Sequence, residues 1–146
     1  MSEPTLQLQR PMRDYIEYFE TLNARSVPLL DKVAAPGFYF KDPFNEVCDI
    51  EAAKRIFAHM FEALDNPKFK VIDYGFSQKG LGFIKWNFTF SMRGRPFGFE
   101  GMTEVTFDKD GKVISHVDYW DSGEHVYEKV PLLKNVIRFA KSKLAA

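Results

Sequence analysis

The sequence predicts an α+β fold in which N-terminal helices pack on a strongly curved antiparallel sheet, with a further helix at the C-terminus. Before Lys68, apolar residues recur at helical spacing, whereas after it they alternate with polar residues, as they do in strands. A run of helices followed by a run of strands is typical of α+β layer folds. The chain also has 15 phenylalanines among its 146 residues, so the concave side of such a sheet would enclose a largely aromatic space.

We expect one folded domain over residues 11–121, preceded by a flexible tail (1–10) and followed by an amphipathic helical tail (122–146). The first residues contain no apolar run of the kind found in signal peptides, and no stretch approaches the length of a membrane span. The single cysteine, Cys48, excludes an internal disulfide bond. These features favour a cytoplasmic protein. The 20 basic and 20 acidic residues form no basic stripe, which argues against a nucleic-acid partner.

The first helix is expected to begin near Pro11 and to end near Asn23, because proline suits a first helical turn. Its apolar face is formed by Tyr15, Tyr18, Phe19 and Leu22. Ser26 is a candidate cap for a short second helix that runs to about Ala34. Residues 38–42 then suit a short strand that Pro43 ends.

A third helix is expected after Asp49, which has the position and chemistry of an N-cap. Its buried stripe consists of Ile50, Ala53, Ile56, Phe57, Met60, Phe61 and Leu64. His59 falls beside the centre of this stripe, so we interpret it as a surface histidine.

Four strands follow as an antiparallel meander, separated by turns at 78–80, 93–95 and 108–111. The second strand has one clearly buried face, formed by Ile84, Trp86, Phe88, Phe90 and Met92. In the third strand the corresponding face holds Phe97, Phe99, Gly101, Thr103, Val105 and Phe107.

The last strand, residues 113–121, has the most unusual composition. Alternation places Ile114, His116, Asp118 and Trp120 on one face. An apolar body with a few polar groups is typical of a pocket wall. The alternative is a two-sided strand in which Asp118 faces solvent and a backbone partner satisfies His116.

The C-terminal segment predicts a basic amphipathic helix, with apolar Leu132, Leu133, Val136, Ile137, Ala140 and Leu144. Its apolar side would pack on the domain or on a second subunit. The alternative is a lid, or an anchor on an anionic lipid surface.

The order of elements resembles the nuclear transport factor 2-like superfamily, a cystatin-like cone of helices on a curved sheet. Residues 18–23, 40–43 and 108–113 resemble three segments of ketosteroid isomerases, and the resemblance covers roughly residues 12–121. It implies a general base at Asp42 and an oxygen donor at Tyr18. Where these isomerases place a protonated aspartate as second donor, this chain has Thr103. The alternative to these catalytic roles is that Asp42 only stabilises a turn and that Tyr18 is an aromatic residue of the core.

With the polar residues His116 and Asp118, the last strand resembles that of SnoaL-like cyclases and of related dehydratases and epoxide hydrolases. Those relatives use Asp, His and Tyr in the same cone for proton transfer. The resemblance implies a cofactor-free acid–base enzyme of the isomerase, cyclase or dehydratase type, acting on a small apolar carbonyl or polycyclic compound. The candidate catalytic residues are Asp42, Tyr18, His116 and Asp118. The candidate substrate-binding residues are Trp86, Phe88, Phe90, Phe99, Thr103, Trp120, Phe57 and Phe61.

The chemistry is plausible from the residues alone, because burial in an aromatic cavity raises the pKa of a carboxylate toward that of a useful base. We therefore expect Asp42 to titrate above about 3.9. The sequence has no Gly-rich phosphate loop, no Gly-x-Ser-x-Gly and no His-x-x-x-His, so neither a cofactor nor a metal is expected. Alternative functions are a non-catalytic module for an apolar ligand and a dimeric protein-interaction domain. We also expect a homodimer that forms through the outer face of the sheet.

Overall fold

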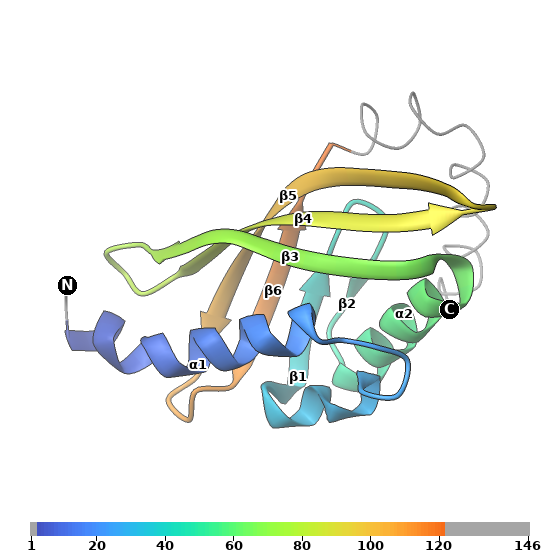
Figure 1. Cartoon of the computed structure of the whole chain (residues 1–146). Coiled ribbons are helices and arrows are strands. Elements are labelled where there is room, and N and C mark those ends of the chain that lie inside the picture. The colour runs from blue at the N-terminus through green and yellow to red at the C-terminus, as the bar shows by residue number, and fades with distance from the viewer. Residues whose placement is uncertain (1–2, 122–146) are drawn as a thin grey trace.

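Figure 1 shows the computed structural model of the chain, in which helices lie on one side of a twisted, curved sheet. The structure describes residues 3–121, so the predicted C-terminal helix lies outside the described residues. In chain order the elements are α1 (Glu3–Glu20), the 3₁₀ helix η1 (Val27–Lys32), β1 (Ala34–Lys41), β2 (Glu46–Val47), α2 (Ile50–Ala63), β3 (Asp65–Phe76), β4 (Gly82–Met92), β5 (Arg95–Phe107) and β6 (Val113–Tyr119). The α+β class is confirmed.

The sheet has six strands in the order β2-β1-β6-β5-β4-β3. Its β3–β6 part is the predicted antiparallel meander. The sheet as a whole is mixed, however, because β1 pairs with β6 in parallel. This pairing brings Phe40 opposite His116. Parallel neighbours are joined by long crossovers, so no local hairpin pattern predicts them.

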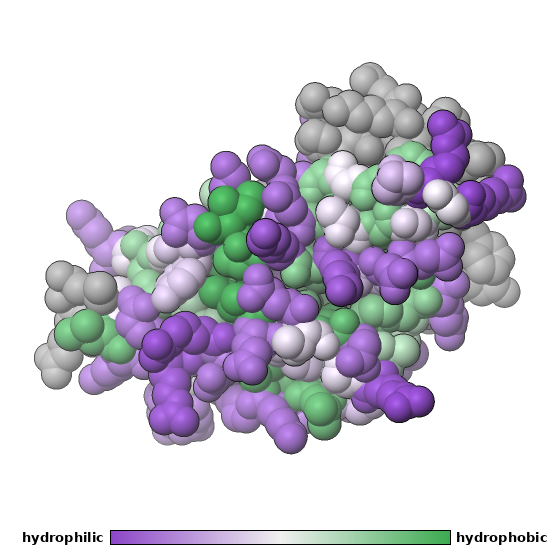
Figure 2. Space-filling model, in the orientation of Figure 1, coloured by the Kyte–Doolittle hydropathy of each residue, from purple (hydrophilic) through white to green (hydrophobic). Residues whose placement is uncertain are grey.

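The core lies between the helices and the concave face of the sheet. Met12 and Tyr15 of α1, Phe38 of β1, Val105 of β5 and Val113 of β6 are all fully buried there. The buried face predicted for β4 is confirmed for Ile84, Trp86, Phe88 and Phe90. Figure 2 shows that hydrophilic side chains cover most of one face of the molecule, with apolar groups visible between them.

The first helix begins at Glu3 and not near Pro11, so residues 3–10, which were expected to form a tail, are helical. Within a helix, Pro11 removes one hydrogen bond to the carbonyl of Gln7. Gln7 is exposed, so water can take that bond. The added turns are held from outside the helix, because the Tyr74 hydroxyl donates to Gln9 Oε1 at 3.2 Å.

The segments around α1 and α2 follow the sequence pattern in part. Asp49 caps α2 as predicted, with Oδ2 accepting the Ala52 N–H at 3.2 Å. The second helix is a short 3₁₀ helix, and Ser26 at its N-cap position makes no side-chain cap. The Ser26 hydroxyl oxygen instead accepts the backbone N–H of Asn23 at 2.9 Å. The first strand starts at Ala34, earlier than predicted.

The register of β6 differs from simple alternation at its start. An irregularity in the β5–β6 pairing lies between Thr106 and Phe107. As a result Val113 is fully buried, whereas Ile114 is 39 % exposed and does not share the inner face. From His116 onward the predicted inner face is correct.

Among the described residues, no helix combines the length and apolarity that crossing a membrane requires.

Candidate functional site

A cavity of about 190 Å³ lies between α1, α2 and the concave face of the sheet. The structure brings ten of the predicted site residues together in its wall: Asp42, Phe57, Trp86, Phe88, Phe90, Phe99, Thr103, His116, Asp118 and Trp120. They come from β1, α2, β4, β5 and the β6 region. The inward register that the strand patterns predicted for Trp86, Thr103, His116 and Asp118 is therefore confirmed.

A buried chain of hydrogen bonds crosses one wall of the cavity. The Tyr15 hydroxyl lies 2.6 Å from His116 Nδ1, and His116 Nε2 lies 2.7 Å from Asp118 Oδ1. Thr103 Oγ1 lies 2.5 Å from the same carboxylate oxygen, and Trp86 Nε1 donates to Thr103 Oγ1 at 2.7 Å. One aspartate is thus fixed by contacts that reach from α1 to β4.

The direction of these bonds follows from donor capacity. An indole N–H can only donate, so Thr103 accepts from Trp86 and gives its single hydrogen to Asp118. With a neutral imidazole, His116 donates from Nε2 to Asp118 and accepts from Tyr15 at Nδ1. Burial, and next the charge of Asp118, raise the pKa of Tyr15 well above its usual range. The Tyr15 hydroxyl therefore keeps its proton and can donate it.

The second oxygen of Asp118 is available to the cavity. Oδ1 takes both hydrogen bonds, whereas Oδ2 makes none to the described residues. No polar side-chain atom in the described part of the chain is both fully buried and without a partner. The Asp118 side chain is 14 % exposed, so Oδ2 meets the open space of the cavity.

Asp42 follows the end of β1, where its side chain also closes a turn. Its Oδ1 accepts the backbone N–H groups of Phe44 at 2.8 Å and Asn45 at 2.7 Å, and Asn45 Nδ2 at 3.2 Å. Its Oδ2 has only a 3.3 Å contact with Asn45 Nδ2. The residue is therefore a turn aspartate and a cavity residue at once.

The pKa of Asp42 is raised to about 6, mainly by burial and next by the charge of Asp118. The hydrogen bonds from Phe44 and Asn45 oppose this rise but do not cancel it. The expectation that Asp42 titrates above its usual value is confirmed in direction.

Aromatic rings form most of the remaining wall. Trp120 stacks on Phe99 at 4.7 Å between ring centroids and meets Phe44 edge-on at 5.4 Å. On β5, Gly101 leaves room for the Trp86 indole, since a Cβ at that position would lie 2.2 Å from its Cη2 atom. A larger residue there would displace the ring that holds Thr103.

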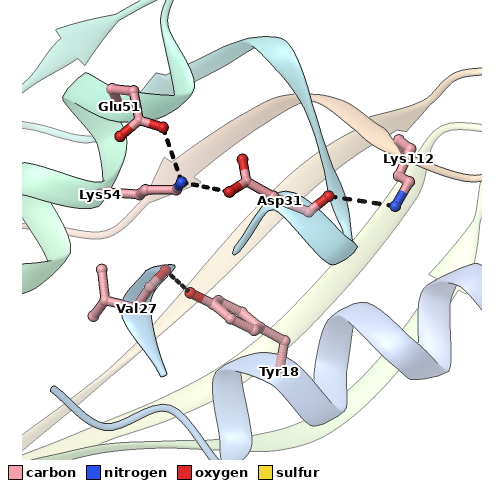
Figure 3. A network of polar contacts seen from close by, with 6 residues as sticks. All are labelled: Tyr18, Val27, Asp31, Glu51, Lys54 and Lys112. Atoms are coloured by element: carbon pink, nitrogen blue, oxygen red, sulfur yellow. Dashed lines mark hydrogen bonds and ion pairs between the residues drawn. The ribbon is translucent and has the colours of Figure 1, made fainter. Parts of the chain in front are cut away.

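Two predicted residues do not belong to the cavity. Tyr18 donates its hydroxyl to the Val27 carbonyl at 2.9 Å and is not a lining residue, so the structure does not place it where the predicted oxygen donor would act. Figure 3 shows Tyr18 facing Val27, close to the contacts of Asp31 with Lys54 and Lys112. Phe61 packs at the edge of the core and does not line the cavity either, because it falls at the edge of the α2 stripe.

Three polar lining residues were missed by sequence reasoning: Tyr15, Asn45 and His59. Tyr15 lies one helical turn before Tyr18 on the same face, and a fully buried tyrosine hydroxyl needs a partner. His59 was interpreted as a surface residue. Its ring lines the cavity, although Nδ1 lies 3.5 Å from Glu62 Oε2.

The lining contains the carboxylates of Asp42 and Asp118 but, among the described residues, no lysine or arginine. Across residues 3–121, no three His, Cys, Asp or Glu side chains gather as ligands for a metal ion. The groups available for chemistry are thus two carboxylates, two imidazoles and hydroxyl groups, which transfer protons.

Comparison with protein families finds that residues 15–116 match a SnoaL-like domain. The matched segment thus begins at Tyr15 and ends at His116. No curated protein sequence matches the chain.

Solved structures with the same fold include a putative SnoaL-like polyketide cyclase from Jannaschia sp. CCS1, 16 % identical, covering 85 % of this chain and 92 % of that one, with a TM-score of 0.71. An LEH-like epoxide hydrolase from M. tuberculosis is 11 % identical, covers 100 % of this chain and 99 % of that one, and has a TM-score of 0.69. A hypothetical protein from Catenulispora acidiphila with a ketosteroid isomerase-like fold, in complex with trimethylamine, is 12 % identical, covers 82 % and 92 %, and has a TM-score of 0.68. At these identities the similarity shows the fold.

Proposed function

Because the chain belongs to the SnoaL-like domain family, we propose that it is a cofactor-free acid–base enzyme that moves a proton on a small, largely apolar compound. The reaction is of the isomerase, cyclase or dehydratase type, in which a proton leaves a carbon next to an electron-withdrawing group. One observation carries the proposal. Two hydrogen bonds, one between Tyr15 and His116 and one between His116 and Asp118, hold the Asp118 carboxylate in place in the cavity wall. The other carboxylate of the cavity, Asp42, has a raised pKa.

Asp42 is the proposed base. With a pKa of about 6 it is mostly ionised at neutral pH, yet it binds a proton more strongly than an ordinary aspartate. Its Oδ1 is occupied by three N–H groups, so Oδ2 is the oxygen that takes the proton. The turn that holds Oδ1 also fixes the direction in which Oδ2 points.

Asp118 is the proposed partner of this base. Its charge is one cause of the raised pKa of Asp42. His116 and Thr103 hold its Oδ1, which leaves Oδ2 to contact the substrate. His116 and Tyr15 act as positioning residues behind it, since His116 uses both ring nitrogens within the wall.

The size of the cavity restricts the substrate. A cavity of roughly 150 Å³ accommodates benzene in another protein, and this one measures about 190 Å³. A compound with one ring and a short substituent is therefore favoured over a large polycyclic one.

The test is a panel of enolisable ketones, imines and small epoxides, followed by Asp42→Asn on any substrate that reacts. This substitution keeps the shape and removes the base, so we expect a loss of about 10² to 10⁴ in kcat/KM. Asp14→Asn is the matched control, because Asp14 is exposed on α1 and does not line the cavity. If Asp42→Asn keeps full activity while His116→Ala or Asp118→Asn abolishes it, the base is on β6 instead.

A second candidate is a non-catalytic binding module. It is favoured by the hydroxyl groups of Tyr15, Tyr18 and Thr103, whose hydrogens are all used within the protein. A substrate oxygen would therefore find none of them free to stabilise it. Apolar ligands that raise the melting temperature without turnover, across the whole panel, would support this reading.

A further inference from the structure

The charges in the cavity wall restrict the chemical class of the ligand more than the volume of the cavity does. We infer that the ligand carries a positive charge on nitrogen, as a small ring compound with an ammonium or iminium group. This inference rests on the proposed function for the location of the site, and it names the class of compound that the site takes.

The fixed charges of the lining are negative. Its acidic groups are Asp42 and Asp118, and no lysine or arginine is present among the described lining residues. His116 does not present a ring nitrogen to a ligand, because both nitrogens are bonded to Tyr15 and Asp118 within the wall. An anionic ligand would enter a poorly solvated space beside two carboxylates, and its charge would be uncompensated. A cationic ligand would compensate the carboxylates instead.

Both carboxylates have capacity left for such a ligand. Asp118 Oδ2 makes no hydrogen bond to the described residues and opens to the cavity. Asp42 Oδ2 has only its 3.3 Å contact with Asn45. An N–H group, or a methylated ammonium, could approach either oxygen without breaking a shorter bond.

The aromatic wall near these carboxylates suits the same ligand. Trp120 contacts both Phe44 and Phe99. The backbone N–H of Phe44 donates to Asp42, and Phe44, Phe99 and Trp120 line the same cavity as that carboxylate. Ring faces attract a partly desolvated cation through their quadrupole. Aromatic faces together with acidic oxygens form the usual surroundings of a bound ammonium group.

A cationic nitrogen also resolves a difficulty in the proposed chemistry. Proton removal beside a carbonyl creates an oxyanion, which enzymes stabilise with free donors. Here the two hydroxyl groups of the cavity wall that come from Tyr15 and Thr103 have already given their hydrogens to His116 and Asp118.

Proton removal beside a protonated imine creates no such oxyanion. The C–H electron pair becomes a C=C bond, the C=N π pair moves to nitrogen, and Asp42 holds the proton. The product is a neutral enamine. The positive charge that the reaction needs is thus supplied by the substrate and not by the protein.

Binding of three probes of similar size tests the inference without any turnover. The probes are benzyltrimethylammonium, its neutral isostere neopentylbenzene, and the anion phenylacetate. The chain has two tryptophans, Trp86 and Trp120, and both line the cavity, so intrinsic fluorescence reports occupancy directly. At pH 7.5 we expect the cation to bind about ten-fold more tightly than the neutral isostere. The anion is expected to bind most weakly.

Aspartate-to-asparagine substitutions show which carboxylates produce the preference for the cationic probe. Asp118→Asn and Asp42→Asn should each reduce the preference for the cation, whereas Asp14→Asn should leave it unchanged. The titratable lining groups are Tyr15, Asp42, His59, His116 and Asp118. Of these, Asp42 should take up a proton near pH 6, so the preference should fall below that pH in the unsubstituted protein. Asp42→Asn should lose this fall.

Equal binding of the cation and its neutral isostere would overturn the inference, as would tightest binding of phenylacetate or no binding of any probe. These outcomes are separate from a failure of the proposed enzyme function. The proposed enzyme function is tested by the effect of Asp42→Asn on turnover, which the binding experiment does not measure.

Discussion

The Tyr15 hydroxyl and His116 Nδ1 lie 2.6 Å apart although the two residues are 101 positions apart in the sequence. This bond connects the first helix to the last strand and sets which imidazole nitrogen carries the proton. Tyr15 accordingly determines how His116 can hold Asp118.

Replacing Tyr15 by Phe should leave His116 Nδ1 buried without its donor. We expect a loss of about 1–3 kcal/mol in the free energy of unfolding, because a buried polar atom would become unsatisfied. Urea denaturation measures this loss, and ¹⁵N NMR of the imidazole reports the change of tautomer. Tyr18→Phe is the matched control, since it removes a hydroxyl that is bonded to the Val27 carbonyl and not to His116. Unchanged imidazole signals in Tyr15→Phe would contradict the assigned role.

The raised pKa of Asp42 predicts a dependence of stability on pH. The folded-state pKa is about 6, above an unfolded value of about 3.9. Between these values the folded state binds more protons, so the Asp42 contribution should fall as pH rises from about 4 to 6. The change should be about 3 kcal/mol, and Asp42→Asn should lack it. Urea titrations of both proteins from pH 4 to 7.5 measure the difference; a difference that does not vary with pH would contradict the prediction.

Gly101→Ala should disturb the wall of the cavity. The added Cβ would lie 2.2 Å from the Trp86 indole, so the ring must move away from Thr103. We expect a loss of stability of at least about 1–3 kcal/mol, together with a shift in tryptophan fluorescence. Gly75→Ala in β3 is the control, because a Cβ there meets nothing within 4 Å. Equal melting temperatures for the two variants would show that Trp86 adapts easily.

A homodimer through the outer face of the sheet remains a prediction. Met102 and Tyr119 are direct partners on β5 and β6, and they are 44 % and 57 % exposed. They form an apolar pair on a face that otherwise carries a polar row: Lys85, Asn87, Thr89, Glu100 and Glu104. We expect a dimer by sedimentation velocity at micromolar concentration, and a monomer for Met102→Lys. Leu29→Lys, at an exposed apolar position on η1, is the control. A monomeric mass for the unsubstituted protein would refute the expected dimer.

Local sequence pattern predicted the meander and the inward direction of its polar residues, because period two determines which face each side chain occupies. It could not choose between Tyr15 and Tyr18. Both lie on one face of α1, and the choice depends on Val27, which satisfies the Tyr18 hydroxyl through a tertiary contact. The extension of α1 before Pro11 likewise depends on Tyr74, which lies far away in the sequence.

The position of β6 within the sheet has a consequence for synthesis of the chain. β6 is the last described strand to leave the ribosome, yet it lies between β1 and β5. Until it emerges, those two strands have no shared neighbour, and each presents an unpaired edge to other chains. A polypeptide truncated before Val113 would therefore be prone to aggregation and would not form a smaller working domain. Completion of the sheet and completion of the cavity are the same event.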